Sequence, residues 1–355
     1  MEKNEKPLIV LLASSETSPA VLYGLYDVLS SVGSAYLEMV SGVAGEDLLD
    51  IKIVAASRKP IRCFGNILVE PHAGIDEIDK PAAVVVCDMY TPIDKPPSGN
   101  YPREIEWLKK VYANNALLAG VCSGTAVIAE TGLLDGMEIT GHWAYRHMFR
   151  KYYPNVKWRE DSILNLSAEH KRIITAGGVT SWQNLALYLI SRYCGVQHAI
   201  DTARVHLLSP HTDGQLPFAT MTQYKQHNDA LISDCQDWIT DNYNCINPVA
   251  RMADRAGLQP RTFARRFRAA TGYPPLDYVQ AFRIEVAKNL LATETVNVDE
   301  IGVTVGYEDP TSFRRLFKRK AGISPAVYRK KFVGMVAQRD SQSGLGLTTN
   351  RRLKN

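Results

Sequence analysis

The chain has 355 residues, of which 45% are hydrophobic and 22% are charged. This composition excludes a disordered or collagen-like protein, and the length favours two domains that each bury a core. The formal net charge of +4 is too small to identify a partner by itself. The six cysteines are scattered without a CxxC pair, which argues against a disulfide framework and a zinc knuckle. We therefore expect a reducing compartment, a cytoplasmic protein and no bound metal or cofactor.

The first apolar run covers residues 8–13, and its flank carries acidic residues. It is too short to cross a bilayer, so we interpret it as a buried strand and expect no membrane partner.

Residues 7–210 alternate strand-like apolar runs with helical segments. The runs are rich in Val, Ile, Leu and Ala, which is typical of strands covered on both faces. This alternation predicts a doubly wound, flavodoxin-like α/β domain over residues 1–213, whose ligands lie at the carboxyl ends of the strands. The expected strands are 7–14, 50–57, 82–88, 116–122 and 172–178. The expected helices are 21–31, 103–115, 123–132, 144–153 and 181–195.

One of these strands ends in GVCSG, which sets Cys122 and Ser123 between two glycines. This pattern is typical of a nucleophile displayed on a tight turn between a strand and a helix. His142 and Trp143 follow another short strand, 138–140, so they could line the same pocket as Cys122. Three interpretations of Cys122 remain open: a nucleophile, a residue that lines a ligand pocket, or a packed structural cysteine.

An internal repeat occupies the last third of the chain. Residues 257–278 match residues 306–328, and most of the paired positions are 50 residues apart. Each copy has a short amphipathic segment, a glycine turn and a helix that begins with proline and has phenylalanines four residues apart, which is the pattern of a helix-turn-helix. Asp309 is a good candidate N-cap of the second such helix, whereas Gln259 is a weaker one in the first copy.

The phenylalanines should pack inward, which leaves the opposite face of each helix free to meet DNA. Residues 231–333 contain 16 Lys and Arg against 11 Asp and Glu, so the basic surplus of the chain lies here. Arginine can bind guanine with two hydrogen bonds, hydroxyls suit bases or phosphates, and lysines mostly neutralise phosphate. The candidate DNA-binding residues are Arg261, Thr262, Arg265, Arg266, Arg268, Thr311, Ser312, Arg314, Arg315 and Lys318.

A single amphipathic segment, 276–293, has the length of a helix that connects the two copies. A rigid connector fixes the separation of the two reading helices. Adjacent major grooves on one face of DNA lie roughly 34 Å apart, so we expect each chain to recognise an asymmetric site that spans two turns.

These motifs carry a family resemblance. The stretch IGVTVGYEDPTSFRRLFKRKAGISPAVYR, within residues 231–333, resembles the AraC/XylS DNA-binding domain. The first two thirds resembles the PfpI-like, class I glutamine-amidotransferase-like domain in the version fused to AraC domains, the GlxA type. The segments that carry this second resemblance are 22–29, 119–136, 139–143 and 172–190.

In catalytic relatives of the PfpI-like domain the cysteine works with a histidine, which matches His142, and with an acid near the first strand. That acid would fall at about Val21, and the glycine pair that often follows a central strand is replaced by CDMY at 87–90. The resemblance therefore implies a regulator rather than an enzyme. The alternative is a cysteine-dependent hydrolase or deglycase that carries a DNA-targeting module.

The sequence thus predicts a sequence-specific transcriptional regulator, controlled by a small effector bound near Cys122, Ser123, His142 and Trp143. The resemblance implies that this regulator is an activator. The resemblance suggests an amino acid or a quaternary amine as effector. The other expected partners are double-stranded DNA, RNA polymerase and a second copy of the chain in a homodimer. We expect a linker at 214–230, the DNA-binding domain at 231–333 and a disordered tail at 334–355.

Overall fold

The computed structural model describes residues 5–167, 171–221 and 227–337, and for 334–337 it describes the backbone only. The chain forms two compact units, Met1–Leu216 and Pro217–Asn355. The first unit extends slightly beyond the expected limit of 213, because Gln215 is buried within it. Most of the expected tail, 338–355, lies outside the described residues, and 334–337 belong to a helix.

The N-terminal unit contains a sheet of seven strands. The order across the sheet is β5 (Ala73–Gly74), β2 (Asp50–Ala55), β1 (Leu8–Leu12), β6 (Ala83–Val86), β7 (Leu117–Val121), β11 (Ile173–Ala176) and β10 (Leu164–Ser167). The strands are parallel except for the edge strand β10. Strands β1, β2, β6, β7 and β11 form at the expected runs, and the doubly wound α/β class is confirmed. The chain adds strands on both sides of β1, so the order reverses between β1 and β6.

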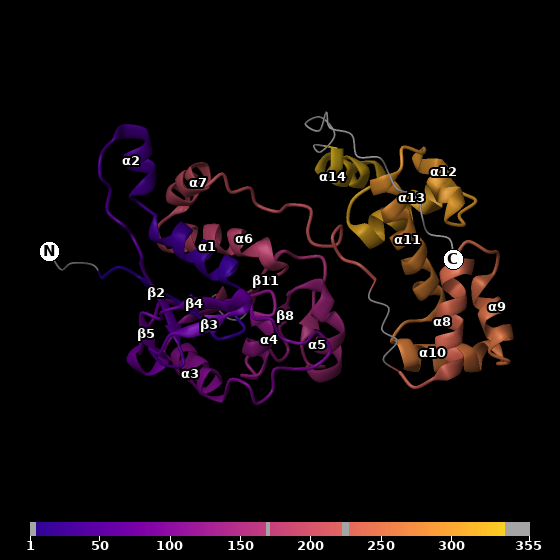
Figure 1. Ribbon diagram of the computed structural model, residues 1–355, viewed down its shortest axis with the longest axis horizontal. Coiled ribbons are helices and arrows are strands. Elements are labelled where there is room, and N and C mark those ends of the chain that lie inside the picture. The colour runs from indigo at the N-terminus through magenta and orange to yellow at the C-terminus, as the bar shows by residue number, and fades with distance from the viewer. Residues whose placement is uncertain (1–4, 168–170, 222–226, 338–355) are drawn as a thin grey trace. The chain divides into compact units, whose positions relative to one another are not determined.

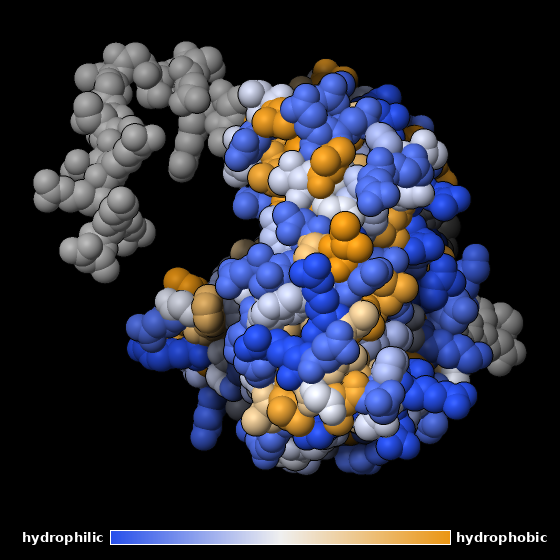
Figure 2. Space-filling view, turned by 90° about the vertical axis from the view of Figure 1, so that its right-hand side faces the viewer, coloured by the Kyte–Doolittle hydropathy of each residue, from blue (hydrophilic) through white to orange (hydrophobic). Residues whose placement is uncertain are grey.

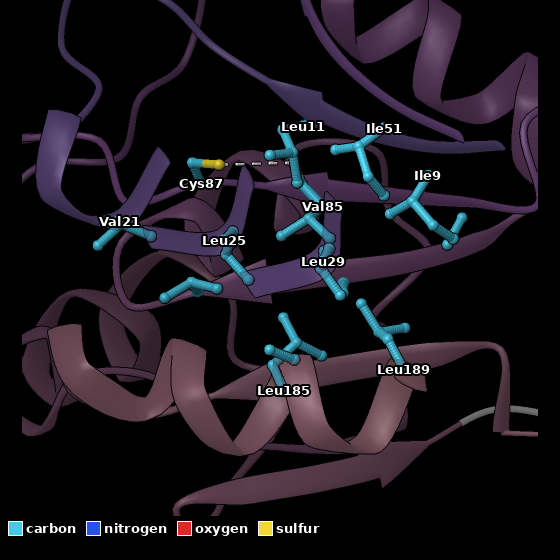
Figure 3. Close-up of a cluster of buried hydrophobic side chains, with 14 of the residues drawn as sticks. Ile9, Leu11, Val21, Leu25, Leu29, Ile51, Val85, Cys87, Leu185 and Leu189 are labelled. Carbon is cyan, nitrogen blue, oxygen red and sulfur yellow. Dashed lines mark hydrogen bonds between the residues drawn. The ribbon is translucent and has the colours of Figure 1, made fainter. Parts of the chain in front are cut away.

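Helices cover both faces of this sheet (Figure 1). On one face, α1 (Pro19–Ser30) and α6 (Trp182–Tyr193) pack on side chains of alternate strand positions, which Figure 3 shows. On the other face lie α3 (Pro102–Ala113), α4 (Gly124–Ala129) and α5 (Arg146–Tyr152). Because both faces are buried, the strands carry almost uninterrupted apolar sequence.

Several small elements were not expected from the sequence. Helices α2 and α7 contact each other beside the main layers, and α2 buries none of its side chains. The small strands are too short to show a clear period of two, so the hydrophobic pattern could not predict them. These elements are α2 (Ala35–Ser41), α7 (Val196–Val205), the hairpin β3 (Ile61–Cys63) and β4 (Ile67–Val69), the short strands β5 and β10 of the main sheet, and β9 (Lys157–Trp158). The strand β8 (Glu138–Ile139), which pairs with β9, forms where the sequence predicts a strand at 138–140.

The described part of the C-terminal unit is helical, as the repeat predicts. Two separate hydrophobic clusters form within it, one for each copy of the repeat. The connecting helix α11 contributes to both clusters. The helices are α8 (Ala230–Asn242), α9 (Pro248–Arg255), α10 (Pro260–Thr271), α11 (Pro275–Thr293), α12 (Val298–Thr304), α13 (Pro310–Ala321) and α14 (Pro325–Ala337). Nowhere in the described residues is there a helix with the length and apolarity that a membrane crossing requires.

Candidate DNA-binding face and ligand site

The first helix-turn-helix consists of α9 and α10. Gly257 follows α9 with a φ of 65°, a left-handed conformation that glycine adopts without strain. Phe263 and Phe267 of α10 are fully buried, which confirms the inward face predicted from their spacing. Gln259 makes no side-chain capping hydrogen bond, so the start of α10 depends on Pro260 and on packing.

The predicted basic face of α10 is exposed but not uniform. Arg261, Thr262, Arg265 and Arg268 are exposed. Arg266 instead donates two hydrogen bonds to Asp229, from Nε to Oδ2 at 2.5 Å and from Nη2 to Oδ1 at 3.0 Å.

The pairing of Arg266 has a simple cause in the repeat. Its equivalent 50 residues later is Leu316, which is buried. Position 266 therefore lies at the edge of the core, where the guanidinium can reach the start of α8. Asp229 also caps that helix by accepting from the backbone N of Ile232. Arg266 thus holds α10 to α8 within the protein, although its charge had placed it in the expected DNA-binding set.

The second helix-turn-helix consists of α12 and α13. The predicted cap is confirmed, because the carboxylate of Asp309 accepts hydrogen bonds from the backbone N atoms of Thr311 and Ser312 at 3.0 and 2.9 Å. Thr311 is exposed, while Ser312 is only half-buried beside its cap. These contacts hold the first turn of α13 in place.

The candidate basic residues of α13 fall into the same two groups as those of α10: one is paired with an acidic side chain, and the others are exposed without such a pair among the described residues. Arg314 donates to Asp299 of α12, so it ties the two helices of the motif together. Arg315 and Lys318 are exposed, and among the described residues neither forms an ion pair with an acidic side chain. Arg315 occupies the position that Arg265 has in the first copy.

Ion pairs lower the pKa of several carboxyls in this unit. The hydrogen bonds from Arg266 hold the pKa of Asp229 below its ordinary value. Arg255 does the same for Asp234, which links α9 to α8. Hydrogen bonds from Ser312 and Thr311 lower the pKa of Asp309. These carboxyls are therefore charged at neutral pH, and the pairs that orient the helices are intact.

The face of the molecule that Figure 2 shows is predominantly hydrophilic, with hydrophobic side chains in separate patches. Within the C-terminal unit, exposed apolar side chains include Ile246, Leu276 and Val303. They border an open groove of about 630 Å³ that is also lined by Arg283 and by Ser312 at the start of α13.

In the N-terminal unit, Cys122 follows β7 at the carboxyl edge of the sheet, as expected. It has a φ of 55°, the strained left-handed conformation of a residue displayed on a sharp turn. Its backbone N donates to the carbonyl of Ala176 on the neighbouring strand at 3.0 Å, which holds this conformation. The Cys122 side chain is nevertheless 5% exposed.

Burial keeps Cys122 protonated. Desolvation raises the pKa of the Cys122 thiol well above its usual range, and the charge of Asp88 raises it further. Ser123 is also buried, and its Oγ donates to Asp88 Oδ1 at 2.6 Å while accepting from the backbone N of Met89 at 2.8 Å. A thiol in this setting is a poor nucleophile, because the thiolate is the reactive form.

Asp88 is the residue of this site that the sequence reasoning missed. It follows β6, next to β7, and is 3% exposed. The available signal was its place at the end of a buried strand, in the CDMY stretch noted as a departure from the family pattern. The position of the expected acid, Val21, is fully buried in α1 and packs in the core that Figure 3 shows.

His142 is oriented by its own backbone. Its Nδ1 accepts from the backbone N of Ala144 at 3.2 Å, and its ring meets that of Tyr145 edge to face. Burial lowers the pKa of His142, so the imidazole is neutral at pH 7. Both His142 and Cys122 are described, and no hydrogen bond joins their side chains.

Gln215 is a second residue of this site that the sequence reasoning missed, and it binds the segment that contains His142. It is 2% exposed, and its Nε2 donates to the carbonyl of Gly141 at 2.9 Å and to Thr140 Oγ1 at 3.1 Å. Its Oε1 accepts from the backbone N of Trp143 at 3.1 Å. Gln215 was expected to lie in a linker, since its polar neighbourhood in the sequence gives no sign of burial.

The comparisons with known proteins match both units. The DJ-1/PfpI family profile matches residues 35–192, and a helix-turn-helix domain profile matches residues 252–331. The chain is 25% identical to the HTH-type transcriptional regulator CdhR of Pseudomonas aeruginosa, over 79% of this chain and 81% of that protein. It is 24% identical to the HTH-type transcriptional regulator GlxA of Rhizobium meliloti, over 60% of this chain and 65% of that protein.

A further relative is the HTH-type transcriptional regulator GbdR of Pseudomonas aeruginosa, which is 21% identical over 84% of this chain and 80% of its own length. The fold and the matches define a DNA-binding transcriptional regulator. Its order of domains, a DJ-1/PfpI domain followed by a helix-turn-helix domain, matches the architecture of the AraC-type regulators of the GlxA type.

Proposed function

We propose that the exposed residues of α10 and α13 read two adjacent major grooves of one operator. The observation that carries this proposal is the equivalence of Arg265 and Arg315, which are both exposed at matched positions of the repeat. Arginine at such a position can donate two hydrogen bonds to guanine. The remaining contacts to bases and phosphates come from Arg261, Thr262, Arg268, Thr311, Ser312 and Lys318. In this proposal Arg266 and Arg314 position the helices through Asp229 and Asp299.

The N-terminal unit binds a small effector in the same proposal. The candidate pocket residues are Cys122, Ser123, His142 and Trp143, together with Asp88. Asp88 is buried and its charge acts on His142 and Tyr145, so a cationic group is suited to this site and an amino acid or a quaternary amine is the proposed effector. The effector changes DNA affinity by about 1 to 3 kcal/mol, the usual range of allosteric coupling.

The regulator acts as an activator in the cytoplasm, as a homodimer that engages RNA polymerase. It is not an enzyme in this proposal. Two features of the site support this part of the proposal. The thiol of Cys122 is buried with a raised pKa, and Nδ1 of His142 accepts a hydrogen bond from the backbone N of Ala144. The alternative, a cysteine-dependent hydrolase or deglycase, requires a thiolate paired with a base, whereas burial favours the protonated thiol of Cys122 and no hydrogen bond joins it to His142 among the described residues.

The test uses the full chain and two probes. Duplexes selected from random DNA are labelled, and their Kd is measured by fluorescence anisotropy with and without glycine betaine or each common amino acid. The expected result is a Kd that one of these probes shifts by about 5- to 150-fold, with the reciprocal shift in the affinity for that probe.

The matched variants are Asp88→Asn, which removes the buried charge, and Glu130→Gln, which removes a carboxylate from the end of α4. Asp88→Asn should abolish the response and Glu130→Gln should preserve it. A Kd that no probe changes would contradict the proposed effector class. Turnover of a glyoxal substrate that Cys122→Ala abolishes would establish the enzymatic alternative.

A further inference from the structure

The two helix-turn-helix motifs do not share one core. The first packs around Phe263 and Phe267, and the second around Phe313 and Phe317. Only Tyr243 packs against both clusters among the described side chains. The relative orientation of α10 and α13 therefore depends on the connecting helix α11 and on the contacts beside it, not on a continuous apolar interior.

Those contacts converge on Arg283 of α11. Its Nε donates to the carbonyl of Tyr243 at 2.7 Å, and its Nη2 donates to the carbonyl of Cys245 at 3.0 Å. Both carbonyls belong to the loop that leads from α8 into α9, the first helix of the first motif. The Nη1 of Arg283 donates to the carbonyl of Gly306, in the turn of the second motif, at 2.9 Å. One planar guanidinium thus joins the loop that enters the first motif to the turn of the second, through a fork of donors that lysine lacks.

The turn of the second motif is shaped for this contact. Gly306 has a φ of 89°, and a Cβ at this position would lie 2.8 Å from the Cα of Asn244 and 2.9 Å from Cζ of Arg283. Only a residue without a side chain allows the two loops to approach so closely. The next residue, Tyr307, places its ring 5.2 Å from the guanidinium carbon of Arg283. We call these five residues, Tyr243, Cys245, Arg283, Gly306 and Tyr307, the Arg283 junction.

We propose that the Arg283 junction determines which spacing of two half-sites the regulator accepts. The inference rests on the proposed reading of DNA by both α10 and α13. If the junction holds the two helices in one orientation, they fit half-sites at one separation only. Each inserted base pair rotates one half-site by roughly 35° about the DNA axis, so a rigid pair cannot follow it. If α10 and α13 are held less rigidly, they can follow this rotation. The chain then gains less affinity from binding both half-sites at once.

The experiment measures spacing preference with the full chain. The probes are the selected operator and the same operator with two base pairs inserted between its halves. For the unaltered chain the insertion should weaken binding by more than about tenfold. For Arg283→Met, which keeps the apolar stem and removes all donors, it should weaken binding less than about threefold, while the affinity for the original spacing falls.

Two further variants separate positioning from simple stability. Arg283→Lys keeps the charge but carries its three donors on one nitrogen, so it cannot reproduce the planar fork that reaches the three carbonyls. Its spacing penalty should fall between those of the unaltered chain and Arg283→Met. Lys330→Met removes one exposed positive charge from α14 and should keep the full penalty. All measurements are made below the thermal midpoint of each protein, which circular dichroism supplies.

The outcomes are distinct. If Arg283→Lys and folded Arg283→Met keep the full spacing penalty, Arg283 has only a structural role and the inference is wrong. If the unaltered chain shows no preference for the selected operator over a scrambled duplex, the proposed function is wrong and the inference fails with it. A reduced penalty in both Arg283 variants supports the inference.

Discussion

Neighbouring arginines on α10 should respond in opposite ways to substitution by alanine. Arg265 is exposed, and among the described residues it forms no ion pair with an acidic side chain, so Arg265→Ala should leave the stability of the fold nearly unchanged. Surface substitutions of this kind change the free energy of unfolding by less than about 0.5 kcal/mol. If Arg265 reads a guanine, its loss weakens DNA binding by about 1 to 3 kcal/mol, which is about 5- to 150-fold in Kd.

Arg266→Ala is the matched control, one residue further along the same helix. It removes the same charge, but it also removes two hydrogen bonds to Asp229 and so loosens the contact between α10 and α8. We expect a lower thermal midpoint and only a small change in Kd, from the lost long-range attraction to phosphates. Anisotropy on the selected operator and thermal unfolding of the full chain measure both quantities. Equal losses of affinity in the two variants, with unchanged stability in both, would refute the assignment of roles.

Three further predictions concern stability and reactivity. Asp309→Ala removes the cap of α13 and should lower the thermal midpoint by about 4 °C, whereas Asp309→Asn should restore most of it. Cys122 should react with iodoacetamide at pH 7.5 more than about tenfold slower than a free cysteine peptide, because its raised pKa and burial suppress the thiolate; mass spectrometry that finds rapid labelling would contradict this. Because their pKa values are lowered, Asp229 and Asp234 stabilise the fold above about pH 4, and this stability is lost as the pH falls through the lowered values. Urea unfolding at pH 6 and pH 3 should show a smaller difference for Asp229→Asn than for the unaltered chain, and an equal difference would be evidence against the ion pair.

The sequence predicted the elements whose pattern is strong and local. Burial on both faces makes the sheet strands continuous apolar runs, and burial of one face gives the phenylalanines of the repeat a helical spacing, so both kinds of element could be located within a few residues. The cap at Asp309 could be predicted for the same reason, since a capping carboxylate lies within three residues of the amides it accepts from.

Contacts between distant residues could not be predicted in this way. The helical spacing of α10 placed Arg266 among the DNA-binding candidates, but its partner Asp229 lies 37 residues earlier. The repeat contained a signal, because the equivalent residue Leu316 is apolar and therefore marks the edge of the core. Gln215 and Arg283 had no signal of that kind, since each binds carbonyl groups that any residue type can supply.

The candidate ligand site was predicted in part. The glycines around Cys122 identified the turn, and the left-handed conformation is present. The charge beside it comes from Asp88 on a neighbouring strand, and the order of the strands, which the sequence does not state, is what brings the two together. The raised pKa of Cys122 depends on that neighbour and on complete burial, and both are properties of the packed domain.

The most direct test of the central claim is a base-by-base map of the operator selected by the full chain from random duplex DNA. Kd is measured for every single base-pair substitution with the unaltered chain, Arg265→Ala and Arg315→Ala. We predict two clusters of specific base pairs about one helical turn apart, with each arginine variant losing discrimination in a different cluster. Selection without any sequence preference, or loss of discrimination at the same base pairs in both variants, would contradict the account.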